Sequence, residues 1–164
     1  NRTRLLAEAT DRLIGVWGAD RVAVRLSPNG DSQGVNDSNP EPLFTHAAKL
    51  LGERKIAFLE LREPGPEGTF GRTEVPKQSP AIRKAFDGVL VLNSDYGFED
   101  GQADLDAGRA DAISFGRPFI ANPDLVTRFR EGAPLNQSEM KTWYSQGPEG
   151  YIDFPTLEEQ SAEA

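Results

Sequence analysis

The chain has 164 residues, a length that suits one domain, and a formal net charge of −8 from 26 acidic and 18 basic residues. This acidity argues against nucleic acid and against an anionic membrane surface as partners, because binding to phosphates requires a basic face. The sequence has no cysteine, which excludes disulfides and thiolate catalysis; with no transmembrane run and no signal peptide before Asn1, we expect a cytoplasmic protein.

The order of the elements follows from the spacing of apolar residues. Repeats near 3.6 positions predict helices, β-branched runs predict strands, and stretches rich in Gly, Pro, Asn and Asp predict loops. In chain order we predict a helix over 2–17 ended by Gly18, a strand over 21–26, a long loop over 28–42, a helix over 43–54, a strand over 56–61, a loop over 62–76, a helix over 79–86, a strand over 88–92, a helix over 98–107 and a strand over 111–115.

The residue pattern of the last part of the chain predicts one more helix, followed by an irregular tail. Asn122 and Pro123 are suited to the N-cap and the first turn of a helix, and Gly132 is suited to the position after its end. We therefore expect this helix to run to about Arg130. The tail over 133–164 is expected to be largely irregular.

Strands that alternate with helices predict a parallel sheet with right-handed crossovers. The strand over 88–92 is nearly continuous in apolar residues, as in strands that are buried on both faces. Two α/β architectures fit this order: an open doubly wound sheet, or part of a (β/α)8 barrel. A dinucleotide-binding open sheet usually carries G-x-G-x-x-G after its first strand, and the sequence has neither this motif nor a P-loop.

Small and polar residues follow three of the predicted strands at their carboxyl ends. They are Arg25, then Asn93, Ser94 and Asp95, then Gly116 and Arg117. Barrel enzymes carry their chemistry at this end, and many bind a phosphate beside the last two strands. Small residues let backbone N–H groups approach an anion, and an arginine adds a bidentate contact. These residues predict a site for a phosphate-bearing ligand; an ordinary turn and an ion-paired arginine are the alternative.

One stretch resembles a known family closely. Residues 115–125, FGRPFIANPDL, are similar to the most recognisable part of the Old Yellow Enzymes, around their eighth strand. Residues 21–28 resemble the fifth strand of that family, residues 1–4 resemble the start of its fourth helix, and residues 149–155 resemble the C-terminal signature of its bacterial branch, the N-ethylmaleimide, pentaerythritol tetranitrate and glycerol trinitrate reductases. The resemblance implies that 1–164 is the C-terminal half of one TIM (β/α)8 barrel, from helix 4 to helix 8 with strands 5–8, and that no second domain is present.

The same resemblance implies FMN as the cofactor, NADPH or NADH as the reductant, and activated alkenes or nitrate esters as substrates. Arg25 would lie beneath the flavin near its N1/C2 carbonyl edge and stabilise the anionic reduced form. The backbone of Asn93, Ser94 and Asp95, together with Gly116 and Arg117, would hold the FMN phosphate. Tyr144 would line the substrate side of the flavin, and Trp143 would pack near its benzenoid end. Asp95 departs from the family, which usually has glycine or alanine here, and its carboxylate would repel a phosphate unless it turns away.

The resemblance also implies that part of the active site is missing. The family's substrate-anchoring pair and its proton-donating tyrosine lie in the N-terminal half, so no catalytic residue is expected in this chain. No metal ligand is expected either, because the carboxylates of the loop over 31–37 lack EF-hand spacing. The single histidine, His46, is expected to be an exposed helix residue.

Four strands cannot close a barrel, and two edges and an apolar inner face would stay exposed. We therefore expect an N-terminal half as partner, either a second chain or a nicked or permuted piece. Two alternatives are another phosphate-binding barrel enzyme without flavin, and a non-catalytic half-barrel that serves in assembly.

Overall fold

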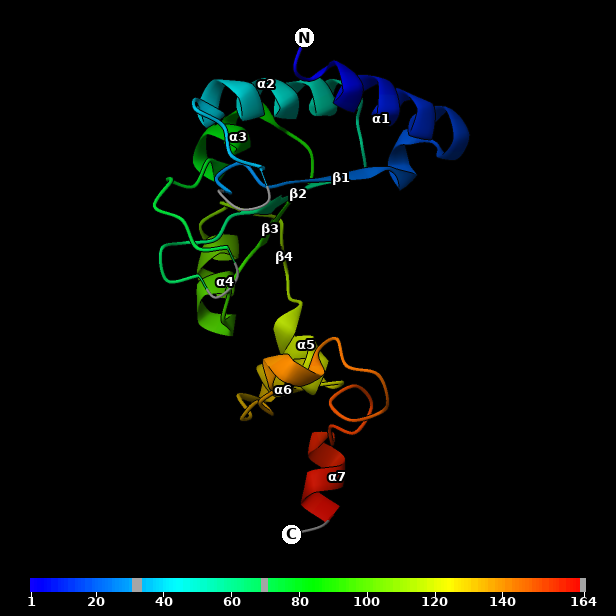
Figure 1. Ribbon diagram of the computed structural model, residues 1–164, viewed down its shortest axis with the longest axis vertical. Helices are drawn as coiled ribbons and strands as arrows, with labels where there is room; N and C mark the ends of the chain where they lie inside the picture. The colour runs from blue at the N-terminus through cyan, green and yellow to red at the C-terminus, as the bar shows by residue number, and fades with distance from the viewer. Residues whose placement is uncertain (31–33, 69–70, 163–164) are drawn as a thin grey trace. The chain divides into compact units, whose positions relative to one another are not determined.

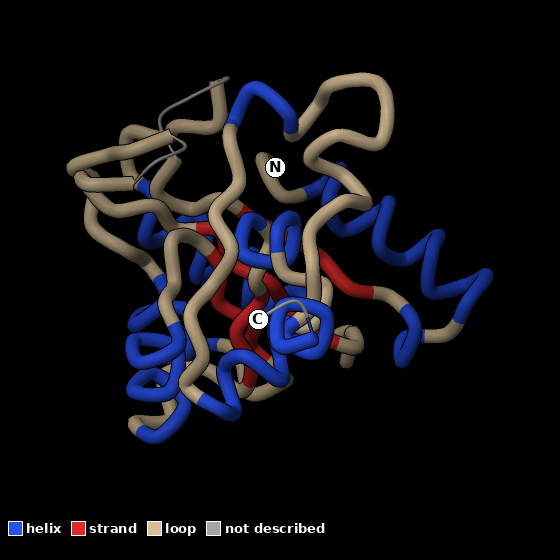
Figure 2. Tube along the Cα trace, turned by 90° about the horizontal axis from the view of Figure 1, so that it is seen from below, coloured by secondary structure: helices blue, strands red, loops and turns tan. Residues whose placement is uncertain are grey.

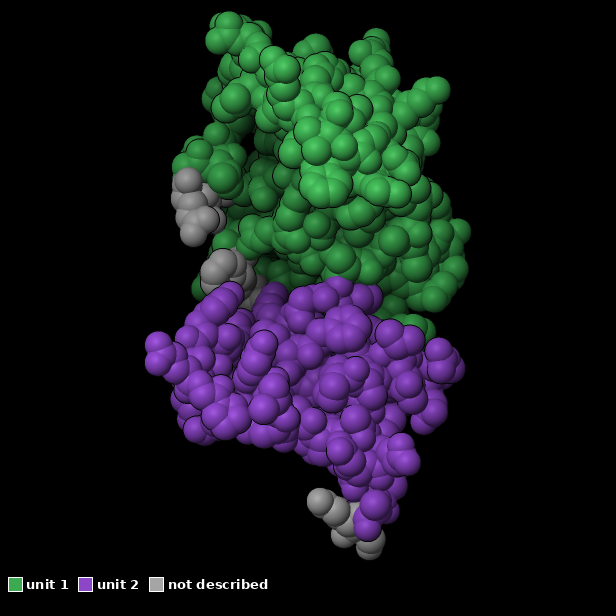
Figure 3. Space-filling model, turned by 90° about the vertical axis from the view of Figure 1, so that its right-hand side faces the viewer, with its two compact units in different colours: residues 1–114 green, residues 115–164 purple. Residues whose placement is uncertain are grey.

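The computed structural model describes residues 1–30, 34–68 and 71–162. The chain divides into two compact units, Asn1–Ser114 and Phe115–Ala164. Figure 3 shows the two units in different colours. Among the described residues, no helix has both the length and the apolar character needed to cross a membrane.

The first unit alternates helices with strands, as predicted (Figure 1). Its four strands form one parallel sheet in the order β1-β2-β3-β4, so each strand pairs with the next one along the chain. The elements are α1 (Arg4–Trp17), a 3-10 turn (Ala19–Arg21), β1 (Ala23–Leu26), α2 (Pro40–Glu53), β2 (Phe58–Arg62), α3 (Ser79–Ala85), β3 (Leu90–Asn93), α4 (Phe98–Asp106) and β4 (Ala112–Ser114).

One face of the sheet is covered by helices and holds the core. Figure 2 shows the strands in red and the helices in blue. Successive side chains of a strand point to opposite faces of the sheet, so every second one lies on this face. In β2 and β3 the side chains on this face are all leucines. They pack against α2 and α3, whose inward side chains are fully buried. The buried set includes Leu59, Leu61, Leu90, Leu92, Ala48, Leu51, Ile82 and Phe86. Burial of this kind contributes about 25 cal/mol for each Å² of apolar surface removed from water, so this face stabilises the unit.

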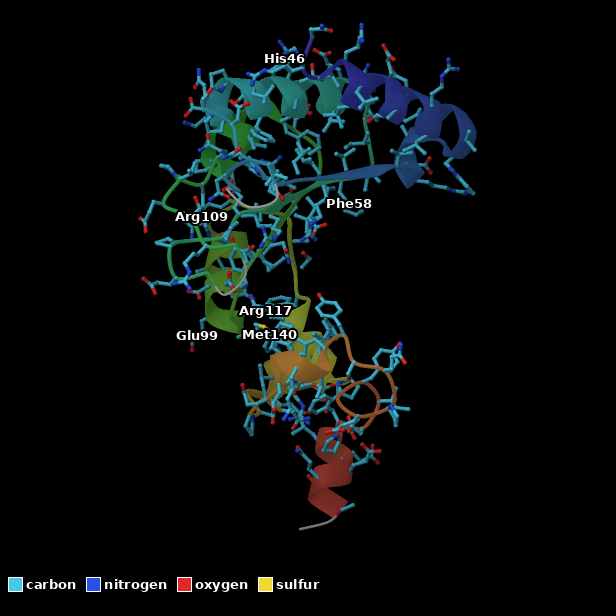
Figure 4. All side chains as sticks on the ribbon, in the orientation of Figure 1. His46, Phe58, Glu99, Arg109, Arg117 and Met140 are labelled. Carbon is cyan, nitrogen blue, oxygen red and sulfur yellow. The ribbon has the colours of Figure 1, made fainter. Side chains whose placement is uncertain are left out.

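The opposite face of the sheet is open. Phe58 is 38% exposed and Val89 is 47% exposed, and Figure 4 shows Phe58 on the side of the sheet away from α1 and α2. Toward the carboxyl ends the same face becomes polar, with Arg25 and Glu60 paired in register. The open face thus carries exposed apolar side chains toward its amino-terminal end and the Arg25–Glu60 pair toward its carboxyl end. Within the described residues, β1 and β4 each pair on one side only.

The ends of α1 and α2 follow local rules, although α2 starts earlier than predicted. Gly18 ends α1 as predicted, with a φ of 84° and its N–H donated to the carbonyl of Ile14 at 2.9 Å. The helix expected over 43–54 begins at Pro40 instead, because a proline is favoured in the first turn, where its missing N–H costs nothing.

The second unit contains α5 (Arg117–Ala121), α6 (Leu125–Glu131), a 3-10 turn (Met140–Thr142) and α7 (Leu157–Ala162). The prediction of Asn122 as the N-cap was wrong, since α6 starts at Leu125 after Asp124. Asn122 is buried and its side-chain amide is used elsewhere: Nδ2 donates to the Pro118 carbonyl at 2.8 Å, and Oδ1 accepts from the Asn136 N–H at 2.8 Å.

A buried arginine organises this unit. Arg128 is 1% exposed. Its Nε donates to Asp124 Oδ1 at 2.7 Å, Nη1 donates to the Pro134 carbonyl at 2.7 Å, and Nη2 donates to the Pro155 carbonyl at 2.9 Å. The second oxygen of Asp124 accepts the N–H of Leu157 at 2.7 Å. The tail is therefore largely irregular, as predicted, yet hydrogen bonds from Arg128 and to Asp124 join it to α6.

Candidate functional site

Arg25 is the penultimate residue of β1, lies on the open face of the sheet and is held from two sides. Its Nη1 lies 2.8 Å from Glu60 Oε1 on β2, and its Nη2 donates to Asn93 Oδ1 on β3 at 2.8 Å. This ion pair agrees with the alternative given above, in which Arg25 is an ion-paired residue of the sheet and not a ligand-binding one. The side chain is nevertheless 49% exposed, whereas that of Glu60 is 15% exposed. Part of the guanidinium is therefore exposed on the side of the sheet that the described helices of the first unit leave uncovered.

Further hydrogen bonds extend this network to the fourth strand, β4. Asn93 Nδ2 donates to the carbonyl of Ser114 on β4 at 2.8 Å, and Ser114 Oγ donates to Glu60 Oε1 at 2.6 Å. We call Arg25, Glu60, Asn93 and Ser114 the polar row. Each member restrains the next, so the guanidinium of Arg25 is fixed in place before any ligand binds.

The turn after β3 has an unusual backbone. Ser94 has a φ of 109° and Asp95 has a φ of 53°, in a region that side-chain-bearing residues rarely adopt. The carboxylate of Asp95 lies beside the loop that follows β2: a Cβ placed on Gly68 would lie 3.3 Å from Asp95 Oδ2. Ser94 and Asp95 line a cavity of about 550 Å³ within the first unit.

Strain at Ser94 leads to a stability prediction. Holding serine at this φ costs on the order of 1 kcal/mol, which glycine does not pay. Ser94→Gly is therefore expected to raise the free energy of unfolding by about 1 kcal/mol in urea titrations followed by circular dichroism. Ser94→Ala is the matched control, because it removes the hydroxyl and keeps the strain. Equal effects of the two variants would contradict this reading.

The cavity beside Asp95 is not suited to a phosphate. Its lining carries the carboxylates of Glu67, Asp95, Asp100 and Asp104 against only Lys77 and Arg109. Tyr96, also in the lining, donates its hydroxyl proton to Asp104 at 2.6 Å. Burial raises the pKa of Tyr96, and the Asp104 carboxylate raises it further, so this hydroxyl stays protonated. An anion would meet net negative charge here, and we assign no ligand to the cavity.

Two buried side chains fix the loops at the carboxyl ends of β1 and β2: Asn29 joins the two loops, and Glu63 joins the second loop to the start of α3. Asn29 Nδ2 donates to the carbonyls of Pro64 at 2.9 Å and Val75 at 3.1 Å. Glu63 Oε1 accepts the N–H groups of Gln78 at 2.5 Å and Ser79 at 3.1 Å, at the start of α3. Burial raises the pKa of Glu63, although these N–H groups oppose the shift. The polar row thus stands on a framework of fixed loops.

The remaining predicted residues lie in the second unit. Gly116 precedes α5, and a Cβ there would meet no atom of the described residues within 4 Å. Arg117 begins α5, and its guanidinium carbon lies 6.0 Å from the centre of the Trp143 ring. Trp143 donates its indole N–H to Ser138 Oγ at 2.9 Å. Tyr144 is 89% exposed.

Other candidate groups are accounted for. His46 is exposed on the outer side of α2, as predicted (Figure 4). Within the described part of the chain, no cluster of His, Cys, Asp or Glu could hold a metal ion.

The donor set can be compared with the needs of a flavin nucleotide. A flavin ring that gains negative charge on reduction needs a cation near its N1/C2 edge, and Arg25 offers a fixed, partly exposed one. A nucleotide phosphate needs backbone that it can approach closely, and Gly116 offers backbone without a side chain beside open space. Each group fits FMN within its own unit.

Comparison with known proteins decides the family. The sequence profile of the NADH:flavin oxidoreductase / NADH oxidase family matches residues 1–136. The chain belongs to this family. It is 58% identical to the Old Yellow Enzyme homologue of Zymomonas mobilis, with a TM-score of 0.93 over 96% of this chain and 44% of that one. The resemblance to the Old Yellow Enzymes is therefore confirmed, and the four parallel strands with their helices are part of that family's barrel fold.

Two further relatives show how much of the family the chain spans. Morphinone reductase is 38% identical, with a TM-score of 0.88 over 98% of this chain and 42% of that chain. A 12-oxophytodienoate reductase-like protein of Solanum lycopersicum is 41% identical over 96% of this chain and 42% of the relative. The chain thus spans about two fifths of the length of these relatives.

Sequence reasoning found Arg25 but missed the groups that hold it. It assigned only the backbone of Asn93 to ligand binding, whereas the side chain of Asn93 contacts both Arg25 and Ser114. It did not single out Glu60 or Ser114. A signal was available, because Glu60 is the one carboxylate in the otherwise apolar segment 56–61, IAFLEL, where a buried charge needs a partner.

Proposed function

We propose that this chain is the C-terminal half of an FMN-dependent oxidoreductase barrel that reduces activated alkenes or nitrate esters with NAD(P)H. The observation that carries the proposal is Arg25: a member of a flavin oxidoreductase family holds a fixed, half-exposed guanidinium at the carboxyl end of an open parallel sheet. Names of the relatives support the class of substrate, since they include reductases of morphinone and 12-oxophytodienoate.

Each candidate site residue has a proposed role. Arg25 places positive charge at the N1/C2 edge of the flavin, which favours the state that carries negative charge there. The phosphate contacts proposed for the first unit are the backbone groups of Asn93, Ser94 and Asp95, and those proposed for the second unit are Gly116 and Arg117. The carboxylate of Asp95 lies beside Gly68 in the acidic cavity, which agrees with a phosphate bound to its backbone instead. Tyr144 lines the substrate side. When bound, FMN would supply the hydride chemistry, taking hydride from NAD(P)H and passing it to the substrate.

The partner proposed is the N-terminal half of the barrel. The open face of the sheet exposes Phe58 and Val89, and β1 and β4 have free edges within the described residues. Further strands from a complementary piece would pair with these edges and bury the apolar part of the face. The proton donor and the substrate anchors would come from that piece.

Complementation tests the proposal. The chain is co-expressed with the part of the Zymomonas mobilis relative that lies outside the 44% it matches. Anaerobic NADPH oxidation is then measured with cyclohexenone and with a nitrate ester. We expect turnover that requires both pieces, and His46→Gln, on the outer side of α2, is expected to retain it. A flavin-loaded complex that reduces neither compound would refute the proposed activity, and an assembled complex without flavin would favour a non-catalytic half-barrel.

A further inference from the structure

The polar row contains a carboxylate that the proposed chemistry does not use. Glu60 lies in register with Arg25, and its Oε1 accepts from Arg25 Nη1 at 2.8 Å and from Ser114 Oγ at 2.6 Å. A site that only needed a cation beneath a flavin would be served by Arg25 and Asn93. The negative charge of Glu60 works against such a cation, so its presence calls for an explanation.

Burial makes this charge effective at a distance. The Glu60 side chain is 15% exposed, and the Arg25 side chain is 49% exposed. Charges shielded from water interact more strongly and are screened less by salt than surface charges. A ligand that approaches the exposed part of Arg25 therefore meets a guanidinium whose charge is partly offset by the carboxylate behind it.

We propose that Glu60 is a positioning residue that aims Arg25 and partly neutralises it, and so holds the reduction potential of the bound flavin below the value that Arg25 alone would give. The inference rests on the proposed function, because it needs a flavin beside Arg25. A lower potential makes the flavin a stronger hydride donor to the substrate, whereas an unopposed arginine would make it an easier acceptor from NAD(P)H. Glu60 sets the balance between these two half-reactions.

The hydrogen bonds show why charge can be separated from geometry here. In its contacts with Arg25 and Ser114, Glu60 uses Oε1 as the acceptor. A glutamine has the same shape and keeps an Oε1 that accepts from Arg25 and from Ser114. Asn93 also continues to hold Nη2 of Arg25. Glu60→Gln therefore removes the charge and leaves the aim of Arg25 in place.

The experiment measures the midpoint potential of the flavin in the complemented barrel by equilibration with a reference dye. Glu60→Gln is expected to raise the ratio of affinities for reduced over oxidised flavin roughly tenfold, since one nearby charge is removed. For a two-electron couple this shifts the potential by about +30 mV. Glu60→Met, which is close in length and also neutral, is expected to shift it in the same direction.

Two controls separate charge from packing. Ser114→Ala removes the other hydrogen bond to Glu60 without changing any charge and should move the potential much less. Glu53→Gln removes an equal charge from the exposed end of α2 and should leave the potential unchanged. An unchanged or lowered potential in Glu60→Gln, with flavin bound, would overturn this inference alone. A wild-type complex that binds no flavin would overturn it together with the proposed function.

Discussion

Replacing Arg128 with methionine is expected to lower the free energy of unfolding of the second unit by about 3–5 kcal/mol. The methionine is close in volume, so little packing is lost, but the Asp124 carboxylate and the carbonyls of Pro134 and Pro155 lose the donors of the buried Arg128 side chain. The Asp124 side chain is 15% exposed, and an unpaired charge that is largely shielded from water is more costly than a missing surface ion pair.

The chain offers a clean probe for this measurement. It has two tryptophans, Trp17 in α1 and Trp143 in the second unit. In a Trp17→Phe background, the fluorescence of Trp143 alone follows urea unfolding of the second unit. Arg128→Lys is the matched control: it keeps the charge, lacks the planar fork, and should give a smaller loss. A loss below about 1 kcal/mol for Arg128→Met, as for an exposed ion pair, would contradict the role assigned to this residue.

Acid should destabilise the second unit through the same contact. Burial alone would raise the pKa of Asp124, but hydrogen bonds from Arg128 and from the Leu157 N–H outweigh burial and lower the pKa below its ordinary value. The stabilisation is therefore complete above the unfolded pKa, about 4 for aspartate, and is lost as the pH falls through the lower folded pKa. In Arg128→Met this loss should begin at a higher pH.

Replacing Arg25 with glutamine should have the largest effect on the proposed reaction. Removal of one fixed donor that stabilises developing charge typically slows the step about 100- to 1,000-fold. In the complemented barrel, anaerobic stopped-flow reduction of the flavin by NADPH should slow by about this factor, while FMN is retained because other residues bind its phosphate.

A variant that keeps the charge serves as the control. Arg25→Lys should recover part of the rate but not the contact with both Glu60 and Asn93, because an ammonium lacks the planar fork. If Arg25→Gln reduced its flavin at the wild-type rate, Arg25 would have no place in the site.

The sequence predicted the strand order and the family because these depend on local patterns. The apolar run at 88–92 and the leucines of β2 favour a parallel sheet with a buried face whatever their neighbours are. Failures arose where a side chain acts at long range. Asn122 has the chemistry of an N-cap, but its partner Asn136 lies 14 positions away, and Pro40 began a helix inside a stretch that composition marked as loop.

The polar row illustrates the same limit. Glu60 and Arg25 are 35 positions apart, and Ser114 is 54 positions from Glu60, so only the register of four strands brings them together. Residue types alone gave Arg25 and the turn at Asn93 as candidates. They could not show that the side chain of Asn93 would face Arg25, because this depends on which face of β3 it occupies.

The central claim is that this chain supplies part of an FMN site. The most direct test is the absorbance spectrum of the chain purified with its complementary piece, together with the intact mass of every chain present. We predict a flavin band that co-elutes with both polypeptides in equal amounts, and that falls when Gly116→Val blocks the backbone beside α5. An assembled pair of chains with no flavin band would contradict the claim.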